Sequence, residues 1–388
     1  MSKVRSSGGR SGGGGVSGRS AGAGGSGRRR GRGQSVTGWV LVLVVLGAAA
    51  SGAVIGFPHL QGALAEWIRG PAPAVEPGSA LRLRVATYNV RFETSGVYSE
   101  ERLRNIQRVV ARLDADILGL VEMHSPADTQ RIVGPGYDVF MLDVEAADSD
   151  SVAGRIANQE VALAVRKGIR PVSTPRMVYP NERQAFPGYR HLLEGIFELP
   201  NGQRVRVYVV HAKSRAGAGR DATDQQRIRH SQLIIEHFRR EKLDLSRDLV
   251  AVIGDFNDTP DDASLNILET GQLDAPARME EEPDTYLVNL GELRWARDQV
   301  TYDPSVLAVM PHGRLSTVVP GARARNFGRQ SRGPVMFDMI LVSPALASRL
   351  APGLEGMQMI YDRADLRSGQ ADLDPSDHIP VFADFMLD

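Results

Sequence analysis

Several apolar, β-favouring runs of this chain begin or end at clusters of Asp, Asn and His, and this pattern constrains the fold most. Asn89 closes one run, Asp255 and Asn257 follow a second, and Asp377 and His378 precede a third. These residue types are poor formers of regular structure. Their placement at strand ends therefore predicts a ligand site built by loops along a sheet edge. Carboxylates, amides and imidazoles together favour a hard divalent cation and a phosphate as ligands.

The region from residue 81 onward alternates strand and helix patterns without a strict βαβ repeat. Strands are expected over residues 83–90, 116–121, 160–165, 195–199, 203–210, 249–253, 336–342 and 379–385. Ser99 is placed to cap a helix that ends at Leu113, and a second helix is expected over 221–242. Asn201 and Gly202 predict a hairpin turn between two of the strands. This mixture indicates an α/β fold with mixed or antiparallel sheets covered by helices. Residues 271–332 show no clear pattern.

The first 80 residues differ in composition from the rest. Residues 1–34 are almost entirely Gly, Ser and Arg, with eight basic residues and no acid, so we expect a disordered tail. Residues 38–57 form an uncharged span of 20 residues, the length of one helical crossing of a bilayer. A buried helix of a soluble core is the alternative, but the span lacks an amphipathic or polar flank. A linker of Pro, Ala and Gly follows at 70–80.

Charges around the apolar span predict its orientation. The basic tail precedes the span, and the nearer downstream stretch has only Arg69, set against Glu66. The positive-inside rule therefore places the N-terminus in the cytoplasm and the region after residue 58 outside it. Ala48-Ala49-Ala50 resembles the cleavage site of a signal peptide. The long tail and the continued apolar run favour an uncleaved, single-pass anchor in the cell membrane, and both interpretations place the large domain outside the cytoplasm.

Residues 81–388 are long enough for one large catalytic domain with a sizeable core. With 37 basic and 44 acidic residues, this region does not have the charge of a tight, nonspecific polyanion binder. The chain has no cysteine, which excludes disulfides, thiolate metal sites and thiol nucleophiles. A zinc site built from His and carboxylates is still conceivable, although hard oxygen ligands predominate.

An ordered set of polar residues runs through this region: Asn89, Glu122, His211, Asp255 with Asn257, Asp338, and Asp377 with His378. Its most specific pieces are GDFND and, about 120 residues later, SDHIPV. This set resembles the endonuclease/exonuclease/phosphatase superfamily, which includes deoxyribonuclease-I-like nucleases, abasic-site endonucleases, neutral sphingomyelinases and inositol-polyphosphate 5-phosphatases. The resemblance spans nearly all of residues 81–388 and implies a four-layer α/β sandwich of two mixed β-sheets flanked by helices, with the active site at one edge.

The resemblance also implies a site for Mg²⁺ or Mn²⁺. Glu122 matches the principal metal ligand, Asn89 the amide beside the metal, and Asp377 an auxiliary ligand or water-binding acid. Mg²⁺ prefers one or two carboxylates together with waters and phosphate oxygens, which agrees with this assignment. Without the other motifs, Glu122 would be explained equally well as a surface residue that follows a strand. Asn89 would likewise be explained equally well as a turn residue that ends a strand. A calcium loop starting at Asp255 lacks the required Gly and terminal Glu.

The catalytic roles implied by the family fall on five residues. Asp255 matches the acid that positions or deprotonates the attacking water, and Asn257 the amide that donates to the phosphate. His378 is oriented by Asp338, and acts either as a base or as a cation that stabilises the phosphate. His211 matches a second histidine that donates to a phosphate oxygen. The family often has other residues where this chain has Val121, Val209 and Ala212, but every charged catalytic position is present.

The expected activity is hydrolysis of phosphodiester bonds by metal-assisted in-line attack of water. The GDFN form is nearer to nucleases, which favours nucleic acid slightly over a phospholipid head group as substrate. A basic stretch also favours a polyanion near His211: Arg204, Arg206, Lys213, Arg215, Arg220, Arg227 and Arg229. A sphingomyelinase-like phosphodiesterase, a phosphomonoesterase and an inactive binding module are the alternatives. The complete set of acids, amides and histidines favours an enzyme, and no obligate protein partner is evident.

Overall fold

The computed structural model describes residues 80–92, 99–141, 160–182, 185–186, 190–215, 220–277, 284–297, 299–302, 335–360 and 375–388. The chain divides into two units, Met1–Pro71 and Ala72–Asp388, and all of these residues lie in the second. The expected tail at 1–34, the span at 38–57 and the linker up to residue 79 lie outside the described residues. Among the helices of the described ranges, none is long and apolar enough to cross a membrane.

Two mixed β-sheets form the centre of the fold. The first has the strand order β12-β13-β1-β2-β4-β3, and its long strand β1 runs parallel to β2 and antiparallel to β13. Its strands are β1 (Leu81–Phe92), β2 (Ile117–Met123), β3 (Tyr137–Phe140), β4 (Glu160–Arg166), β12 (Gln358–Met359) and β13 (Val381–Leu387). The chain therefore closes this sheet by placing its C-terminal strand beside the first described strand.

The second sheet has the strand order β10-β11-β9-β8-β7-β5, and β6 also pairs with β7. Strand β8 runs parallel to β9, while β11 is antiparallel to β9 on its other side. The strands are β5 (Arg170–Pro171), β6 (Arg176–Met177), β7 (Leu193–Glu198), β8 (Arg204–His211), β9 (Leu249–Asp255), β10 (Val288–Asn289) and β11 (Asp338–Val342). The expected hairpin is confirmed, because β7 and β8 pair antiparallel across the turn at Asn201 and Gly202.

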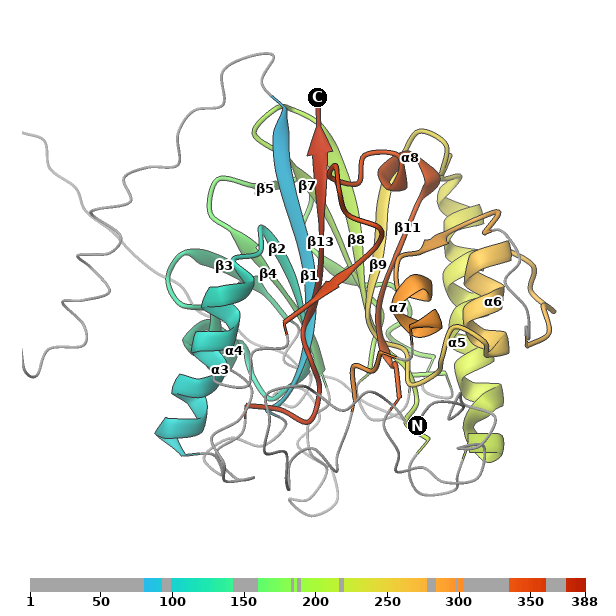
Figure 1. Cartoon of the computed structure of the whole chain (residues 1–388), viewed down its shortest axis with the longest axis horizontal. Coiled ribbons are helices and arrows are strands. Elements are labelled where there is room, and N and C mark those ends of the chain that lie inside the picture. The colour runs from blue at the N-terminus through green and yellow to red at the C-terminus, as the bar shows by residue number, and fades with distance from the viewer. Residues whose placement is uncertain are drawn as a thin grey trace, which may run out of the picture. The chain divides into compact units, whose positions relative to one another are not determined.

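The two sheets pack face to face, with helices on their outer faces (Figure 1). Along β2, Ile117 and Val121 belong to the core between the sheets, whereas Leu118 and Leu120 belong to a second core beneath the helices. This alternation is the period of two that a strand buried on both faces requires. At Gly119 the sheets approach so closely that a Cβ atom would lie 2.8 Å from Cδ1 of Ile253.

Helices α3 (Glu100–Leu113) and α4 (Pro126–Val133) lie on the side of the first sheet, and α5 (Arg220–Glu241) and α6 (Ala263–Thr270) on the side of the second (Figure 1). Shorter helices are α7 (Glu292–Ala296) and α8 (Pro344–Ala347). The expected cap of α3 is present, since Ser99 Oγ accepts a hydrogen bond from Arg102 N at 3.1 Å. The predicted α/β sandwich of two mixed sheets flanked by helices is thus confirmed. Helices α4 and α6 were not expected from the sequence.

Candidate active site and metal centre

Strand register brings the predicted polar residues to one edge of the sandwich. His211 ends β8 and pairs with Asp255 at the end of β9, and Asp338 pairs with Asp255 from the other side at the start of β11. Asn89 approaches from the first sheet, and its Nδ2 donates to Oδ2 of Asp255 at 3.0 Å. Asn89 points inward because it keeps the alternation of Val85, whose side chain lies in the core between the sheets. The site therefore lies across the seam between the two sheets.

Glu122 reaches the site through an irregularity in its strand. The pairing of β2 with β4 shifts between Val121 and Met123, and Glu122 has a φ of 58°. A bulge of this kind re-aims a side chain that regular alternation would send to the other face. Glu122 Oε1 consequently lies 3.2 Å from Asn89 Nδ2 and 3.7 Å from His211 Nε2.

Glu122, His211 and Asp255 form a candidate metal centre. Each offers one ligand atom, and these three atoms lie within 4.8 Å of one another. Two carboxylates and an imidazole at this spacing fit a divalent cation. The sequence had assigned His211 to a phosphate oxygen and Asp255 to the attacking water, and the structure brings their ligand atoms together with that of Glu122.

The two other predicted metal residues contact this centre differently. Asn89 Oδ1 accepts a hydrogen bond from Arg91 N at 3.1 Å, so its NH₂ group rather than its oxygen faces Glu122 and Asp255. Asp377 lines the same cavity but belongs to none of the possible metal-binding clusters found among the described residues. Its Oδ2 lies 3.4 Å from Nη1 of Arg91.

His378 and Asp338 form a buried pair beside this centre. The Nδ1–H of His378 donates to Oδ2 of Asp338 at 2.7 Å, and Nε2 lies 3.9 Å from Oδ2 of Asp255. Burial opposes protonation of His378, but the charge of Asp338 and its hydrogen bond outweigh burial and raise the pKa of the imidazole. Burial also raises the pKa of Asp338, and His378 offsets this only partly. The protonated form of His378 is therefore favoured.

Asn257 is held rigidly next to Asp255. Its backbone N–H donates to Oδ1 of Asp255 at 2.8 Å, and its φ of 52° places it in the left-handed region that Asn tolerates. Its Nδ2 donates to the carbonyl of Ala212 at 3.1 Å, and its own carbonyl accepts from Nε of Arg215 at 2.8 Å. These contacts fix the amide beside the acid, as the predicted phosphate-binding role requires.

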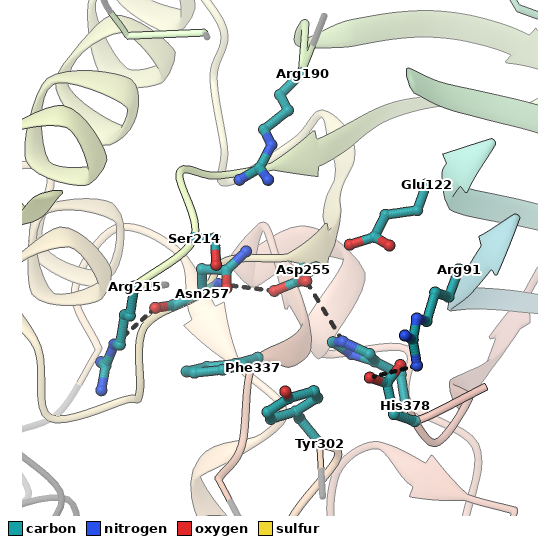
Figure 2. Close-up of a pocket in the computed structure, with 11 residues that line it drawn as sticks. Arg91, Glu122, Arg190, Ser214, Arg215, Asp255, Asn257, Tyr302, Phe337 and His378 are labelled. Carbon is teal, nitrogen blue, oxygen red and sulfur yellow. Dashed lines mark hydrogen bonds and ion pairs between the residues drawn. The ribbon is translucent and has the colours of Figure 1, made fainter. Parts of the chain in front are cut away.

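A cavity of about 190 Å³ opens over these residues (Figure 2). The sequence had predicted five of the residues that line it, namely Glu122, Asp255, Asn257, Asp377 and His378. It had given no role in the cavity to Arg91, Arg190, Ser214, Tyr302 or Phe337, which also line it. Tyr302 and Phe337 stack at 5.5 Å and form an aromatic wall next to His378. The place of Arg91 in the cavity could have been predicted, because Arg91 directly follows the motif that contains Asn89.

Four arginines of the predicted basic stretch near His211 form ion pairs within the protein, and one of them, Arg215, also lines the cavity. Arg206 pairs with Glu194, and the buried Arg215 pairs with Asp258 and Asp262. Arg227 is fully buried and pairs with Asp258 and Asp224, and Arg229 pairs with Glu236. The acidic partners lie up to 47 residues from their arginines in the sequence, and the largest separation is that between Arg215 and Asp262. The side chain of Arg220 lies outside the description.

Comparison with known proteins agrees with this geometry. A model of the Endonuclease/Exonuclease/phosphatase family matches residues 86–378, well over half of the chain. No functionally curated protein matches the sequence at a significant level.

Solved structures with a similar fold include a complex of D. rerio TDP2 with a single strand DNA product. It has 18% sequence identity and a TM-score of 0.50, covering 78% of this chain and 98% of that one. An endonuclease/exonuclease/phosphatase from Bacteroides vulgatus has 16% identity and a TM-score of 0.49, covering 79% and 100%. The human Nocturnin catalytic domain with bound sulfate has 15% identity and a TM-score of 0.45, covering 78% and 94%. At these identities the likeness concerns the fold alone.

Proposed function

Since the chain belongs to the endonuclease/exonuclease/phosphatase family and is a phosphoesterase, we propose that it hydrolyses phosphodiester bonds with the help of Mg²⁺ or Mn²⁺. The observation that carries this proposal is the position of Asp255. It lies within reach of the metal-binding atoms of Glu122 and His211, and it accepts a hydrogen bond from Asn89. The same carboxylate lies 3.9 Å from His378 Nε2.

In the proposed reaction, Asp255 orients the attacking water and accepts its proton as the new P–O bond forms. Asn257 donates its amide N–H to a phosphate oxygen. His378, kept protonated by Asp338, donates to another phosphate oxygen or to the leaving oxygen as the old P–O bond breaks. Glu122, His211 and Asp255 would hold a divalent cation, which would supply charge neutralisation to the phosphate. Phosphoryl transfer needs mainly this positioning and charge stabilisation.

Of the two roles open to His378, the raised pKa supports that of a cation facing phosphate. An imidazole that retains its proton at neutral pH is a poor base but a strong donor. Asp255 is then the residue that takes the proton of the water. Asn89 is proposed to hold the carboxylates of Glu122 and Asp255 in register through its NH₂ group.

For the substrate, we favour nucleic acid. Tyr302 is half-buried, lines the cavity and is backed by the buried Phe337, and aromatic rings of this kind stack on bases without regard to sequence. The D. rerio TDP2 structure of similar fold is a complex with a single strand DNA product. The negative charge of residues 81–388 argues for weak, salt-dependent binding with no sequence preference.

A phospholipid head group is the second candidate, favoured by the apolar span at 38–57, which would hold the enzyme at a bilayer. Hydrolysis of plasmid DNA and of sphingomyelin vesicles by the full-length protein, with Mg²⁺ and then with EDTA, tests the choice. Metal-dependent cleavage of DNA is expected. Metal-dependent cleavage of the vesicles with DNA left intact would make phospholipid the favoured substrate. Activity that persists on either substrate in EDTA would contradict the proposed metal dependence.

For the location, we propose a single-pass anchor with a cytoplasmic N-terminus and an extracytoplasmic catalytic domain. The support is the basic tail before the uncharged span. Protease added to intact spheroplasts should digest the catalytic domain and spare the tail. A catalytic domain that is protected until the membrane is permeabilised would show that the orientation is wrong.

A further inference from the structure

The segments that carry Asn89 and His378 meet at a residue to which the reaction proposed above gives no role. Ser376 begins the SDHIPV motif and is only 4% exposed. Its Oγ donates to the carbonyl of Asn89 at 2.7 Å and accepts the backbone N–H of His378 at 3.1 Å. One hydroxyl therefore links the backbones of two site residues that lie 289 residues apart in the sequence.

Arg102 joins the same two segments by a second set of contacts. It belongs to α3, on the outer side of the first sheet (Figure 1), and it is buried. Its Nη2 donates to three backbone carbonyls, those of Val90 at 3.2 Å, Arg91 at 3.0 Å and Pro375 at 3.0 Å. The first two belong to the end of β1, and the third belongs to the segment before β13. Buried carbonyls need a donor, and the guanidinium supplies one to both segments at once.

The end of β1 needs such support because its backbone is irregular there. The pairing of β1 with β2 shifts its register just beyond Asn89, and Arg91 has a φ of 48°, which is uncommon for a residue other than Gly. The N–H of Arg91 donates to Oδ1 of Asn89. The NH₂ group of that amide is thereby turned toward the carboxylates of Glu122 and Asp255. A strained conformation of this kind persists only where surrounding contacts hold it, and the bond from Arg102 to the Arg91 carbonyl is one of them.

The start of α3 fixes the direction of Arg102. Ser99 caps the helix, and its Oγ accepts the backbone N–H of Arg102 itself at 3.1 Å. Leu103 and Ile106 of the same helix are buried in the core beneath the helices. The base of the arginine side chain is therefore fixed before a substrate binds, so that little further ordering is needed.

We propose that Arg102 and Ser376 are positioning residues, which hold Asn89 and His378 in register at the edge of the first sheet. This inference rests on the proposed phosphodiester hydrolysis. Among the described residues that line the cavity, neither Arg102 nor Ser376 is present, so neither is placed to touch the substrate. They act through the amide of Asn89, which contacts both carboxylates of the candidate metal centre, and through the imidazole of His378. In such a site a displacement of about 1 Å can cost about 10²-fold in rate.

The test uses the full-length protein with Ser376→Ala, Arg102→Met and Arg102→Lys. The kcat and KM for bis(p-nitrophenyl) phosphate are measured with Mg²⁺ present, and calorimetric titration gives the affinity for Mn²⁺. Ser376→Ala and Arg102→Met should lower kcat by about 10–10²-fold, because the reacting groups are displaced. The KM should change by less than about threefold, because no contact with the substrate is lost. The affinity for Mn²⁺ should fall about tenfold, since Asn89 orients two of the proposed ligands. Arg102→Lys keeps a donor for the carbonyls, so its kcat should lie between those of wild type and Arg102→Met.

A second measurement separates positioning from general support of the fold. If the hydroxyl of Ser376 acts through His378, its loss should matter less once the imidazole is absent. Ser376→Ala is therefore expected to lower kcat by a smaller factor in a His378→Ala background than in the wild type. Equal factors in the two backgrounds would overturn the assignment of Ser376.

Arg84→Met is the matched control, because Arg84 also joins β1 to the C-terminal strand, at the end of β1 opposite Asn89. It is largely buried and pairs with Asp384 of β13. Its loss should lower the melting temperature but leave kcat and the affinity for Mn²⁺ within about threefold of wild type.

A kcat and an affinity for Mn²⁺ within about threefold of wild type in both Ser376→Ala and Arg102→Met would overturn the proposal. If Arg102→Met does not fold, the same result in Ser376→Ala and Arg102→Lys would overturn it. A wild type that binds Mn²⁺ but hydrolyses no phosphodiester would instead contradict the proposed function. The Mn²⁺ affinities of the variants would then test the positioning residues by themselves.

Discussion

The Nδ1–H of His378 donates to Oδ2 of Asp338 at 2.7 Å, and the two residues come from different sheets. Asp338 begins β11 of the second sheet, and His378 lies just before β13 of the first. Thr301 Oγ1 accepts the backbone N–H groups of Phe337 and Asp338 at 2.9 and 2.8 Å, which fixes the acid from behind. The pair therefore ties the sheets together at the edge where the candidate metal centre lies.

The first prediction concerns this pair. Asp338→Asn should lower kcat by about 10²–10⁴-fold, because the amide no longer stabilises protonated His378 or fixes its tautomer. His378→Ala should have a similar effect, and the double variant should be little worse than either single one. Steady-state kinetics of the three proteins, with circular dichroism to verify folding, is the measurement. Strictly additive losses would show that the two residues act independently.

Much of the site was predictable because strand ends are visible in sequence. Asn89, Glu122, His211, Asp255 and Asp338 each lie at or near the end of an apolar run, and parallel or antiparallel pairing then places such ends at a common edge. The Ser99 cap and the Asn201-Gly202 turn were readable for a similar reason, since their chemistry is local. Helix α4 also has a local start signal, the cap residue Ser125 before Pro126. The helix is too short to show a clear helical periodicity, and it was therefore not predicted.

The features that the sequence did not predict depend on contacts between residues that are distant in the chain. The basic stretch around Arg215 and Arg227 looked like a phosphate-binding surface, yet Asp258 and Asp262 neutralise it inside the protein. Arg190 belongs to no motif, and its place in the cavity follows from the carbonyl of Ala212. The role of an arginine is set by the charges it meets after folding, and composition does not reveal them.

The second prediction separates the two acids assigned to the metal. Glu122→Gln should raise the Mg²⁺ concentration needed for half-maximal activity by about 10–100-fold or more, because it removes a charged ligand of the centre. Asp377→Asn should shift it less, since Asp377 faces Arg91 and lies outside the Glu122 cluster. Calorimetric titration with Mn²⁺ gives the affinity independently of turnover. Equal losses of affinity in both variants would place Asp377 in the first coordination sphere beside Glu122.

The third prediction concerns the arginine beneath the GDFND loop. Arg227 is fully buried, with Nε 2.7 Å from Oδ1 of Asp258 and Nη1 donating to the Lys213 carbonyl at 3.0 Å. Arg227→Met leaves Asp258 with one fewer cation in a buried site and should cost about 3–5 kcal/mol of unfolding free energy. Arg229→Met, on the same helix, removes an exposed pair with Glu236 and should cost about 0–1 kcal/mol. Urea denaturation measures both, and equal losses would contradict the assignment.

The fourth prediction concerns the buried carboxylate of Glu194, on the face of β7 beneath α5. Its Oε1 accepts from Tyr208 Oη at 2.8 Å and lies 3.2 Å from His237 Nε2, and its Oε2 accepts from Arg176 Nε at 2.7 Å. Burial alone would raise the pKa of Glu194, but the hydrogen bonds from His237, Arg176 and Tyr208 outweigh it and hold the pKa well below its ordinary value.

A depressed pKa in the folded protein means that the unfolded chain takes up the proton first as the solution becomes acidic. The stability contributed by Glu194 is therefore complete above its ordinary pKa of about 4.3, and it is lost as the pH falls from there toward the folded value. The melting temperature of Glu194→Gln should lie well below that of wild type at pH 7, and the gap should narrow below about pH 4. Glu198→Gln is the control. Glu198 lies on the same strand as Glu194 but forms a more exposed pair, with Arg170, so the melting temperature of this variant should differ little from that of wild type. Melting curves of wild type and Glu194→Gln that stay parallel from pH 7 to pH 3 would mean that the charge of Glu194 does not stabilise the fold.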